Sequence, residues 1–127
     1  MGQMKTNKPK ILYAEDQETI ARLIEFKLSK EGYEVTLLKS GENVVKKTIE
    51  MKPVLILLDL MLPIKDGMAI LKELKSNKDV KNIPVIVLSI HAEEQKILQA
   101  LNLGAVDYIQ KPFSPAELAT RIRKALA

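Results

Sequence analysis

The stretch Val54-Leu55-Ile56-Leu57-Leu58-Asp59 decides the fold of this chain, because five consecutive apolar residues end abruptly in a carboxylate. Three further apolar runs end in polar groups: Ile11-Leu12-Tyr13-Ala14 before Glu15-Asp16, Ile83-Pro84-Val85-Ile86-Val87-Leu88 before Ser89, and Val106-Asp107-Tyr108-Ile109-Gln110 before Lys111. Runs of this kind are typical of buried parallel strands. The carboxyl ends of such strands emerge at one edge of a sheet, where ligands bind. The sequence therefore predicts a polar site at that edge.

Helix-like segments alternate with these strand-like runs. Apolar periodicity and cap signals predict helices over residues 17–31, 41–51, 66–75 and 93–103, a last helix beginning near Ser114, and a further strand over residues 35–38. Strict alternation favours βα units with right-handed crossovers. We therefore expect an α/β fold, a doubly wound, flavodoxin-like sheet of five parallel strands in the order 2-1-3-4-5 with helices on both faces. In this order the first and third strands are neighbours, and they carry Glu15, Asp16 and Asp59.

Several residues mark the ends of the predicted helices. Gly32 follows one of them and suits the left-handed conformation that ends many helices, and Gly104 closes another. Ser114-Pro115-Ala116-Glu117 combines a serine N-cap, a proline at the first helical position and a glutamate that would complete a capping box. These signals predict where the chain turns back toward the sheet.

Length and composition indicate one domain. The chain has 127 residues, 46% of them hydrophobic and 28% charged, and we expect a flexible N-terminal segment over residues 1–9 and one domain over residues 10–127. No stretch approaches the ~20 apolar residues that span a bilayer, and the polar, basic residues 5–10 are unlike a signal peptide. Because cysteine is also absent from the sequence, we expect a cytoplasmic protein that does not bind membranes.

The net charge of +4, from 20 basic and 16 acidic residues, is mild. The lysines are spread along the chain without aromatic residues between them, whereas nucleic-acid sites favour a concentrated basic stripe or stacking aromatic side chains. We therefore expect no direct binding of nucleic acid. Solvated helix faces account for most of the lysines, and binding of acidic protein partners is the alternative interpretation.

The three carboxylates at the predicted switch point suit a hard divalent cation such as Mg²⁺ or Mn²⁺. Asp16 and Asp59 can be direct ligands, and Glu15 can act through a water molecule. Three carboxylates packed together repel one another unless a cation neutralises them. The alternative is a set of solvated acids at strand ends, which would suit a single acid better than three.

Asp59 is the natural nucleophile of the set, because a carboxylate can attack phosphorus and hold an aspartyl phosphate. Lys111 can supply a fixed cation for one phosphoryl oxygen, and Ser89 can donate a hydrogen bond to another. An ordinary surface lysine before Pro112 and an ordinary hydroxyl at a strand end stay open as alternatives. Met61 stands where a haloacid-dehalogenase-like phosphatase needs a second acid, which favours a protein that keeps its phosphoryl group.

Taken together, four motifs resemble the receiver domain of two-component response regulators, over about residues 10–127. They are Ile11-Leu12-Tyr13-Ala14-Glu15-Asp16, Leu57-Leu58-Asp59-Leu60-Met61-Leu62-Pro63 continuing to Asp66-Gly67, Pro84-Val85-Ile86-Val87-Leu88-Ser89, and Gly104-Ala105-Val106-Asp107-Tyr108-Ile109-Gln110-Lys111-Pro112-Phe113. Each motif alone is moderately specific. All four, in order over one domain, are highly specific.

The resemblance implies a role for each residue of the site. It implies that Asp59 accepts the phosphoryl group and that Ser89 and Lys111 bind it. It also implies that Asp16, Asp59 and the Met61 carbonyl bind Mg²⁺. Tyr108 corresponds to an aromatic switch that turns inward when Ser89 moves toward the phosphate, although the sequence equally suits a half-buried aromatic on an edge strand. The Lys111-Pro112 bond is cis in the family.

The function implied by the resemblance is a phosphorylation-activated signalling module. Its phosphodonor would be a sensor histidine kinase, a histidine phosphotransfer protein or a small phosphodonor, and its only catalysis would be self-phosphorylation and slow autodephosphorylation. An effector protein would dock on the helix over residues 93–103, the strand over residues 106–110 and the last helix. We expect a monomer or a phosphorylation-dependent dimer. The alternatives are an aspartyl-phosphate phosphatase on a similar fold and a receiver-like scaffold that works without phosphorylation.

Two positions depart from the family pattern. Glu15 stands where many members have aspartate, which lengthens the reach to the metal. Ile90 follows Ser89 where the family usually has a small residue, and its bulk would narrow access to the phosphoryl group. His91, the single histidine, is expected to be a loop residue that flanks the site.

Overall fold

Residues 8–127 form one sheet of five parallel strands in the order β2-β1-β3-β4-β5, as the sequence predicts. The strands of this computed structural model are β1 (Lys10–Ala14), β2 (Glu34–Leu38), β3 (Leu55–Asp59), β4 (Val85–Ser89) and β5 (Asp107–Gln110). The structure describes residues 8–127. The expected flexible segment over residues 1–9 lies outside the described residues, apart from its last two positions.

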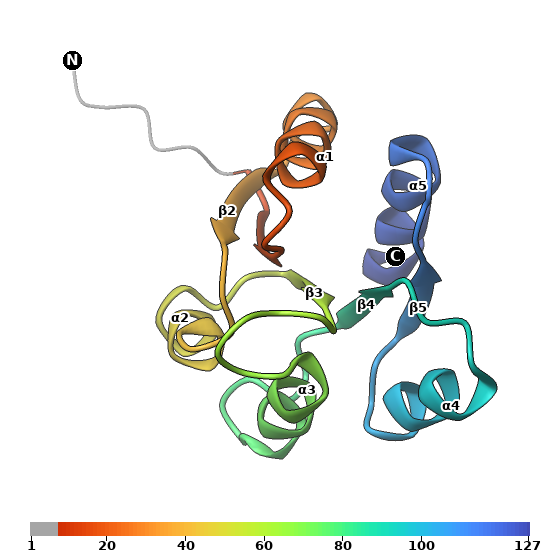
Figure 1. The fold of residues 1–127 in the computed structure, drawn as a ribbon. Helices are drawn as coiled ribbons and strands as arrows, with labels where there is room; N and C mark the ends of the chain where they lie inside the picture. Colours follow the sequence, from red (N-terminus) through yellow and green to blue (C-terminus); the bar gives the residue numbers. More distant parts are fainter. Residues whose placement is uncertain (1–7) are drawn as a thin grey trace.

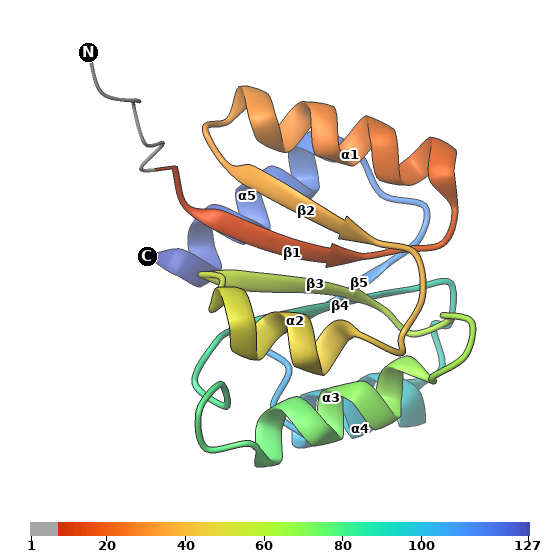
Figure 2. The same ribbon diagram turned by 90° about the vertical axis from the view of Figure 1, so that its left-hand side faces the viewer.

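The five helices of the described part of the chain lie in two layers, one on each face of the sheet (Figures 1 and 2). One face is covered by α1 (Glu18–Lys30) and α5 (Pro115–Leu126), and the other by α2 (Val44–Met51), α3 (Gly67–Ser76) and α4 (Glu94–Asn102). Within residues 8–127, no helix combines the length and the apolar character that a membrane crossing would require.

Residues along each strand contribute alternately to the cores on the two faces of the sheet, because successive side chains of a strand point to opposite faces. Ile11 and Tyr13 of β1 pack under α1 and α5, whereas Leu12 and Ala14 pack under the other three helices. Every residue of β3 and β4 is buried. Burial on both faces explains why these two strands read as continuous apolar runs.

The register of the sheet brings the strand ends to one edge. Ala14 pairs with Leu58, so the residues that follow β1 lie beside Asp59 at the end of β3. Asp59 pairs in turn with Leu88, the residue before Ser89. Ser89 pairs with Gln110, which precedes Lys111. The four polar strand ends therefore converge.

Helix α2 begins at Val44, so the predicted start at residue 41 is wrong. Gly41 instead packs against the loop after β3: its backbone N–H donates to the Pro63 carbonyl at 3.1 Å. A Cβ at Gly41 would lie 2.3 Å from the carbonyl oxygen of Lys65, so only glycine fits this approach. The helical pattern of the sequence therefore extends into residues that a tertiary contact holds in another conformation.

The other helix ends follow the sequence signals with one exception. Gly32 has φ of +99°, as predicted for a left-handed cap, and Gly104, which follows α4 as predicted, has φ of +114°. The Ser114 hydroxyl accepts a hydrogen bond from the Glu117 backbone N–H at 3.0 Å. The Glu117 carboxylate does not complete the predicted capping box, because it pairs with the Arg121 guanidinium at 3.1 Å.

The connection from β3 through its loop to the first residue of α3 contains one tight approach and one unfavourable backbone conformation. Gly67 lies so close to the end of β3 that a Cβ there would be 2.5 Å from the Leu60 Cα and 2.6 Å from the Asp59 carbonyl oxygen. In the same loop Ile64 has φ of +74°, which is rare for a β-branched residue. The Ile64 side chain is 75% exposed, so packing does not offset this strain.

We predict that Ile64→Gly stabilises the protein. The left-handed region costs a residue with a Cβ roughly 1–2 kcal/mol, whereas glycine costs about 0.5–1 kcal/mol in backbone entropy. The free energy of unfolding, measured by urea melts, should therefore rise by about 0.5–1 kcal/mol.

Ile90→Gly is the matched control for this prediction. Ile90 is also largely exposed, at 61%, but it is not among the residues with positive φ. Glycine at this position should lower the free energy of unfolding. If Ile64→Gly is no more stable than the parent, the backbone at Ile64 is not strained.

Candidate functional site

Three carboxylates meet where strands β1 and β3 end. One oxygen from each of Glu15, Asp16 and Asp59 lies within 4.8 Å of the others. Glu15 and Asp59 are buried, at 1% and 3% exposure, and Asp16 is exposed. The predicted convergence of these acids is confirmed, and two of the three are not the solvated acids of the alternative interpretation.

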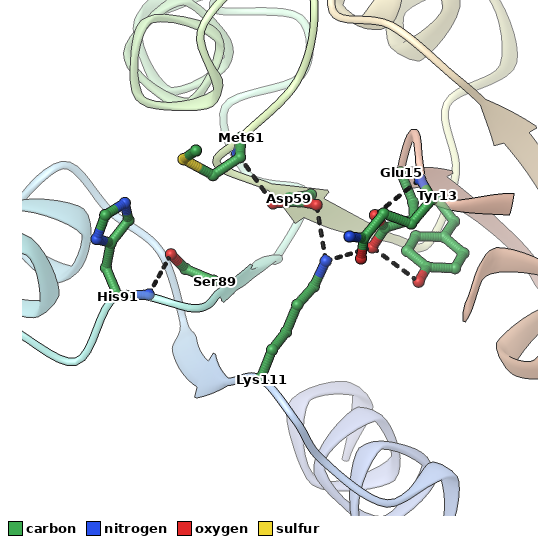
Figure 3. A network of polar contacts seen from close by, with 8 residues as sticks. Tyr13, Glu15, Asp59, Met61, Ser89, His91 and Lys111 are labelled. Atoms are coloured by element: carbon green, nitrogen blue, oxygen red, sulfur yellow. Dashed lines mark hydrogen bonds and ion pairs between the residues drawn. The ribbon is translucent and has the colours of Figure 1, made fainter. Parts of the chain in front are cut away.

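The Lys111 ammonium bridges the two buried carboxylates (Figure 3). Its Nζ donates to Glu15 Oε1 at 2.7 Å and to Asp59 Oδ2 at 2.8 Å. Lys111 is only 9% exposed, so the alternative of an ordinary surface lysine is wrong. The peptide bond between Lys111 and Pro112 is cis, as the resemblance implies.

One ammonium is shared by two buried carboxylates, and the pKa directions of Glu15 and Lys111 reflect this. Burial raises the pKa of Glu15, the neighbouring Asp59 raises it further, and Lys111 opposes both effects. Burial alone would lower the pKa of Lys111, but its bonds to Asp59 and Glu15 outweigh burial and raise the pKa above the ordinary lysine value. With all four groups ionised the cluster carries a charge of −2, three negative charges against one positive. A single divalent cation would balance it.

The donor set fits a hard divalent cation. All three acids offer carboxylate oxygens, and Asp16 and Asp59 line a solvent-facing cleft of about 250 Å³ together with Met61 and Lys111. Mg²⁺ is typically bound by one or two carboxylates and several waters, and this cleft has room for waters. Asp59 is fixed within it, because its Oδ1 accepts a hydrogen bond from the Met61 backbone N–H at 2.9 Å.

Glu15 has a partner that our sequence analysis missed. The Tyr13 hydroxyl donates to Glu15 Oε1 at 3.3 Å (Figure 3), and the Gln17 backbone N–H donates to Oε2 at 3.2 Å. Burial, followed by the charge of Glu15, raises the pKa of Tyr13. The signal was present in the sequence, because residues two apart on a strand share one face of the sheet.

The two predicted switch residues are linked through the backbone of His91. The buried Ser89 Oγ accepts a hydrogen bond from the His91 N–H at 3.0 Å (Figure 3), and the half-buried Tyr108 hydroxyl donates to the His91 carbonyl at 2.8 Å. Among residues 8–127, no hydrogen bond joins Ser89 Oγ to Asp59 or to Lys111. The His91 ring lies beside Glu93 in the loop, consistent with a flanking position.

Known proteins resemble this chain in sequence over nearly its whole length. The profile of the response regulator receiver domain family matches residues 11–123. The alkaline phosphatase synthesis transcriptional regulatory protein PhoP of Bacillus subtilis is 40% identical over 117 residues, which are 92% of this chain and 48% of PhoP. The probable transcriptional regulator ycf27 of Cyanophora paradoxa is 41% identical over 123 residues, 97% of this chain and 50% of ycf27. The chain thus spans about half the length of either relative.

Solved structures share the fold. The BeF3-activated N-terminal receiver domain of RstA from Klebsiella pneumoniae has a TM-score of 0.85 at 33% identity, covering 92% of this chain and 97% of that one. The receiver domain of the sensor histidine kinase PA1611 from Pseudomonas aeruginosa, with a magnesium ion coordinated in its active site cleft, has a TM-score of 0.85 at 30% identity, covering 94% and 98%. The chain therefore belongs to the family of response regulator receiver domains, which are modules of two-component signalling.

Proposed function

We propose that Asp59 is the phosphoacceptor of this receiver domain and that a histidine-phosphorylated protein is its donor. One observation carries the proposal: the Asp59 carboxylate stands at the end of a central strand, bonded to a buried ammonium and facing an open cleft. An Asp59 oxygen would attack phosphorus as the bond between phosphorus and the imidazole nitrogen breaks, and the imidazole would keep that electron pair. The product is an aspartyl phosphate.

The carboxylates would hold a divalent cation, Mg²⁺ or Mn²⁺, during this transfer. Asp16, Asp59 and the Met61 carbonyl would be direct ligands, and Glu15 would act through water. The cluster charge of −2 and the small separation of its oxygens support this assignment. A related receiver domain holds magnesium in its active site cleft. When bound, the ion would offset negative charge on the transferring group.

Lys111 would stabilise the phosphoryl group after transfer. Its Nζ is already placed 2.8 Å from Asp59 Oδ2, and burial keeps water from competing for it. A preorganised cation in a buried site stabilises developing negative charge without the cost of reorienting solvent. The same ammonium also donates a hydrogen bond to Glu15, so Lys111 can shift toward a phosphoryl oxygen without losing both of its partners.

Ser89 and Tyr108 would couple phosphorylation of Asp59 to a change in the surface that an effector binds. Within residues 8–127 Ser89 Oγ only accepts a hydrogen bond, from His91 N–H, so its own proton is available for a phosphoryl oxygen. Movement of residues 89–91 would also move the His91 carbonyl that holds the Tyr108 hydroxyl. The face made by α4, β5 and α5, where Tyr108 lies, would then change for an effector.

The proposed activity is self-phosphorylation with slow loss of the phosphoryl group, and two features weigh against the alternatives. A phosphatase of similar fold needs an acid two residues after Asp59, and Met61, with an exposed side chain, occupies that position. A scaffold independent of phosphorylation would not need the acids and the lysine together, yet the three acids cluster at the strand ends and Lys111 pairs with two of them. The effector would be a separate protein or another part of a longer regulator.

We predict a single phosphoryl group per chain, on Asp59, after incubation with acetyl phosphate and Mg²⁺. Intact-mass measurement and peptide mapping give its number and position. Asp59→Asn should abolish the label, whereas Asp66→Asn, which removes an exposed aspartate at the start of α3, should leave it unchanged. A slowly lost label supports a signalling module, rapid release a phosphatase, and no label a scaffold. Full labelling of Asp59→Asn would refute the assignment.

We also predict that Ser89→Ala separates phosphorylation from switching. NMR spectra of the parent with beryllofluoride and Mg²⁺ should show large shifts from residue 89 to residue 111 and small shifts in α2. In Ser89→Ala, Asp59 should still accept a phosphoryl group, but the shifts in α4 and β5 should shrink several-fold. Ser76→Ala, at the far end of α3, serves as the control. Undiminished shifts in Ser89→Ala would exclude this switch.

A further inference from the structure

Tyr13 places a buried phenol directly against the acid cluster. Its side chain is 0% exposed and packs in the core under α1 and α5. Only the hydroxyl reaches the edge of the sheet, where it meets the Glu15 carboxylate (Figure 3). Within residues 8–127, Glu15 Oε1 at 3.3 Å is the one hydrogen-bond acceptor of this hydroxyl. A buried hydroxyl needs such a partner, so the contact constrains both side chains.

The Glu15 carboxylate accepts three hydrogen bonds from the described residues, and the three donors differ in whether they also bond elsewhere. Lys111 Nζ bonds to Oε1 but is shared with Asp59, and the backbone N–H of Gln17 bonds to Oε2. Tyr13 is the one side chain among the described residues that bonds to Glu15 alone. Glutamate has one more rotatable bond than aspartate, so its carboxylate needs more restraint to stay in one place.

We propose that Tyr13 is a positioning residue for the divalent cation. Its hydroxyl holds the buried Glu15 carboxylate in the position where one of its oxygens lies within 4.8 Å of oxygens of Asp16 and Asp59. The cation affinity of the cluster then depends on a phenol that touches neither the ion nor the phosphoryl group. The inference rests on the proposed function only in that the cation binds at these three acids.

A purely structural role for Tyr13 makes different predictions. A residue that only fills the core would change stability equally with and without the ion, and its effect would not depend on the length of the side chain at position 15. A positioning residue changes ion affinity through Glu15. The ring is retained in Tyr13→Phe, so core volume is nearly unchanged.

The experiment measures Mg²⁺ affinity by titration calorimetry, with magnesium alone as the probe. Tyr13→Phe should weaken binding about three- to tenfold, the loss expected for one hydrogen bond that orients a carboxylate acting on the ion through water. Tyr33→Phe is the control, because Tyr33 packs against the same core cluster but lies beside the amino end of β1, whereas Glu15 follows the carboxyl end of that strand. The affinity of that variant should equal that of the parent.

The decisive step is the same substitution in a Glu15→Asp background. Aspartate is shorter by one methylene, so its carboxylate should not reach the Tyr13 hydroxyl. Tyr13→Phe should therefore leave Mg²⁺ affinity unchanged in that background. An equal loss in both backgrounds would overturn the inference, and so would an unchanged affinity of Tyr13→Phe in the parent background. Failure of the parent itself to bind Mg²⁺ would instead count against the proposed function.

A second measurement requires no variant. In the parent, NMR signals of labelled tyrosine rings should report the bound ion through Tyr13. The Tyr13 signals should shift along the Mg²⁺ titration with the dissociation constant found by calorimetry, and those of Tyr33 should not. Tyr13 signals that stay fixed while the ion binds would overturn the inference even if Tyr13→Phe fails to fold.

Discussion

The sharing of one buried ammonium by two buried carboxylates is the interaction on which the site depends. Lys111 lies 2.7 Å from Glu15 and 2.8 Å from Asp59, and these three groups come from three different strand ends. Removing one partner of a buried ion pair leaves an uncompensated charge and is strongly destabilising. Even with Lys111 present, the cluster retains an excess of negative charge. Part of this charge lies on Asp16, which is exposed and lines the cleft. This excess of negative charge destabilises the fold, and it also favours the binding of a cation at the site.

The geometry of the sheet leaves the backbone around the site little conformational freedom. Parallel pairing fixes the relative heights of the strand ends, and Gly67 lets α3 approach the end of β3 more closely than any other residue would allow. The neighbouring loop holds Ile64 in an unfavourable conformation. Rigid strands thus carry the charged groups, while the loops after β3 and β4 surround them and supply backbone hydrogen bonds to Asp59 and Ser89.

Much of this structure could be predicted from the sequence, because its main signals are local. Continuous apolar runs such as the one before Asp59 indicate strands buried on both faces, and their order along the chain determines the switch point. The predicted start of α2 was wrong because Gly41 is held by a contact with a distant loop, and the apolar periodicity of the sequence carries no information about such a contact. The link between Tyr13 and Glu15 was missed because an aromatic residue in a strand is usually read as core. The roles of Asp59, Ser89 and Tyr108 stay predictions, since they concern a phosphorylated state.

A crystal structure with Mn²⁺ and beryllofluoride would test the central claim most directly, because the ion gives an anomalous signal. The proposed site predicts an anomalous peak in contact with carboxylate oxygens of Asp16 and Asp59. It also predicts beryllofluoride on Asp59, with the Lys111 ammonium moved from Asp59 to a fluorine while its bond to Glu15 persists. A peak elsewhere, or beryllofluoride absent from Asp59 while Lys111 still bridges both carboxylates, would contradict the claim that this charge cluster is the cation and phosphoryl site.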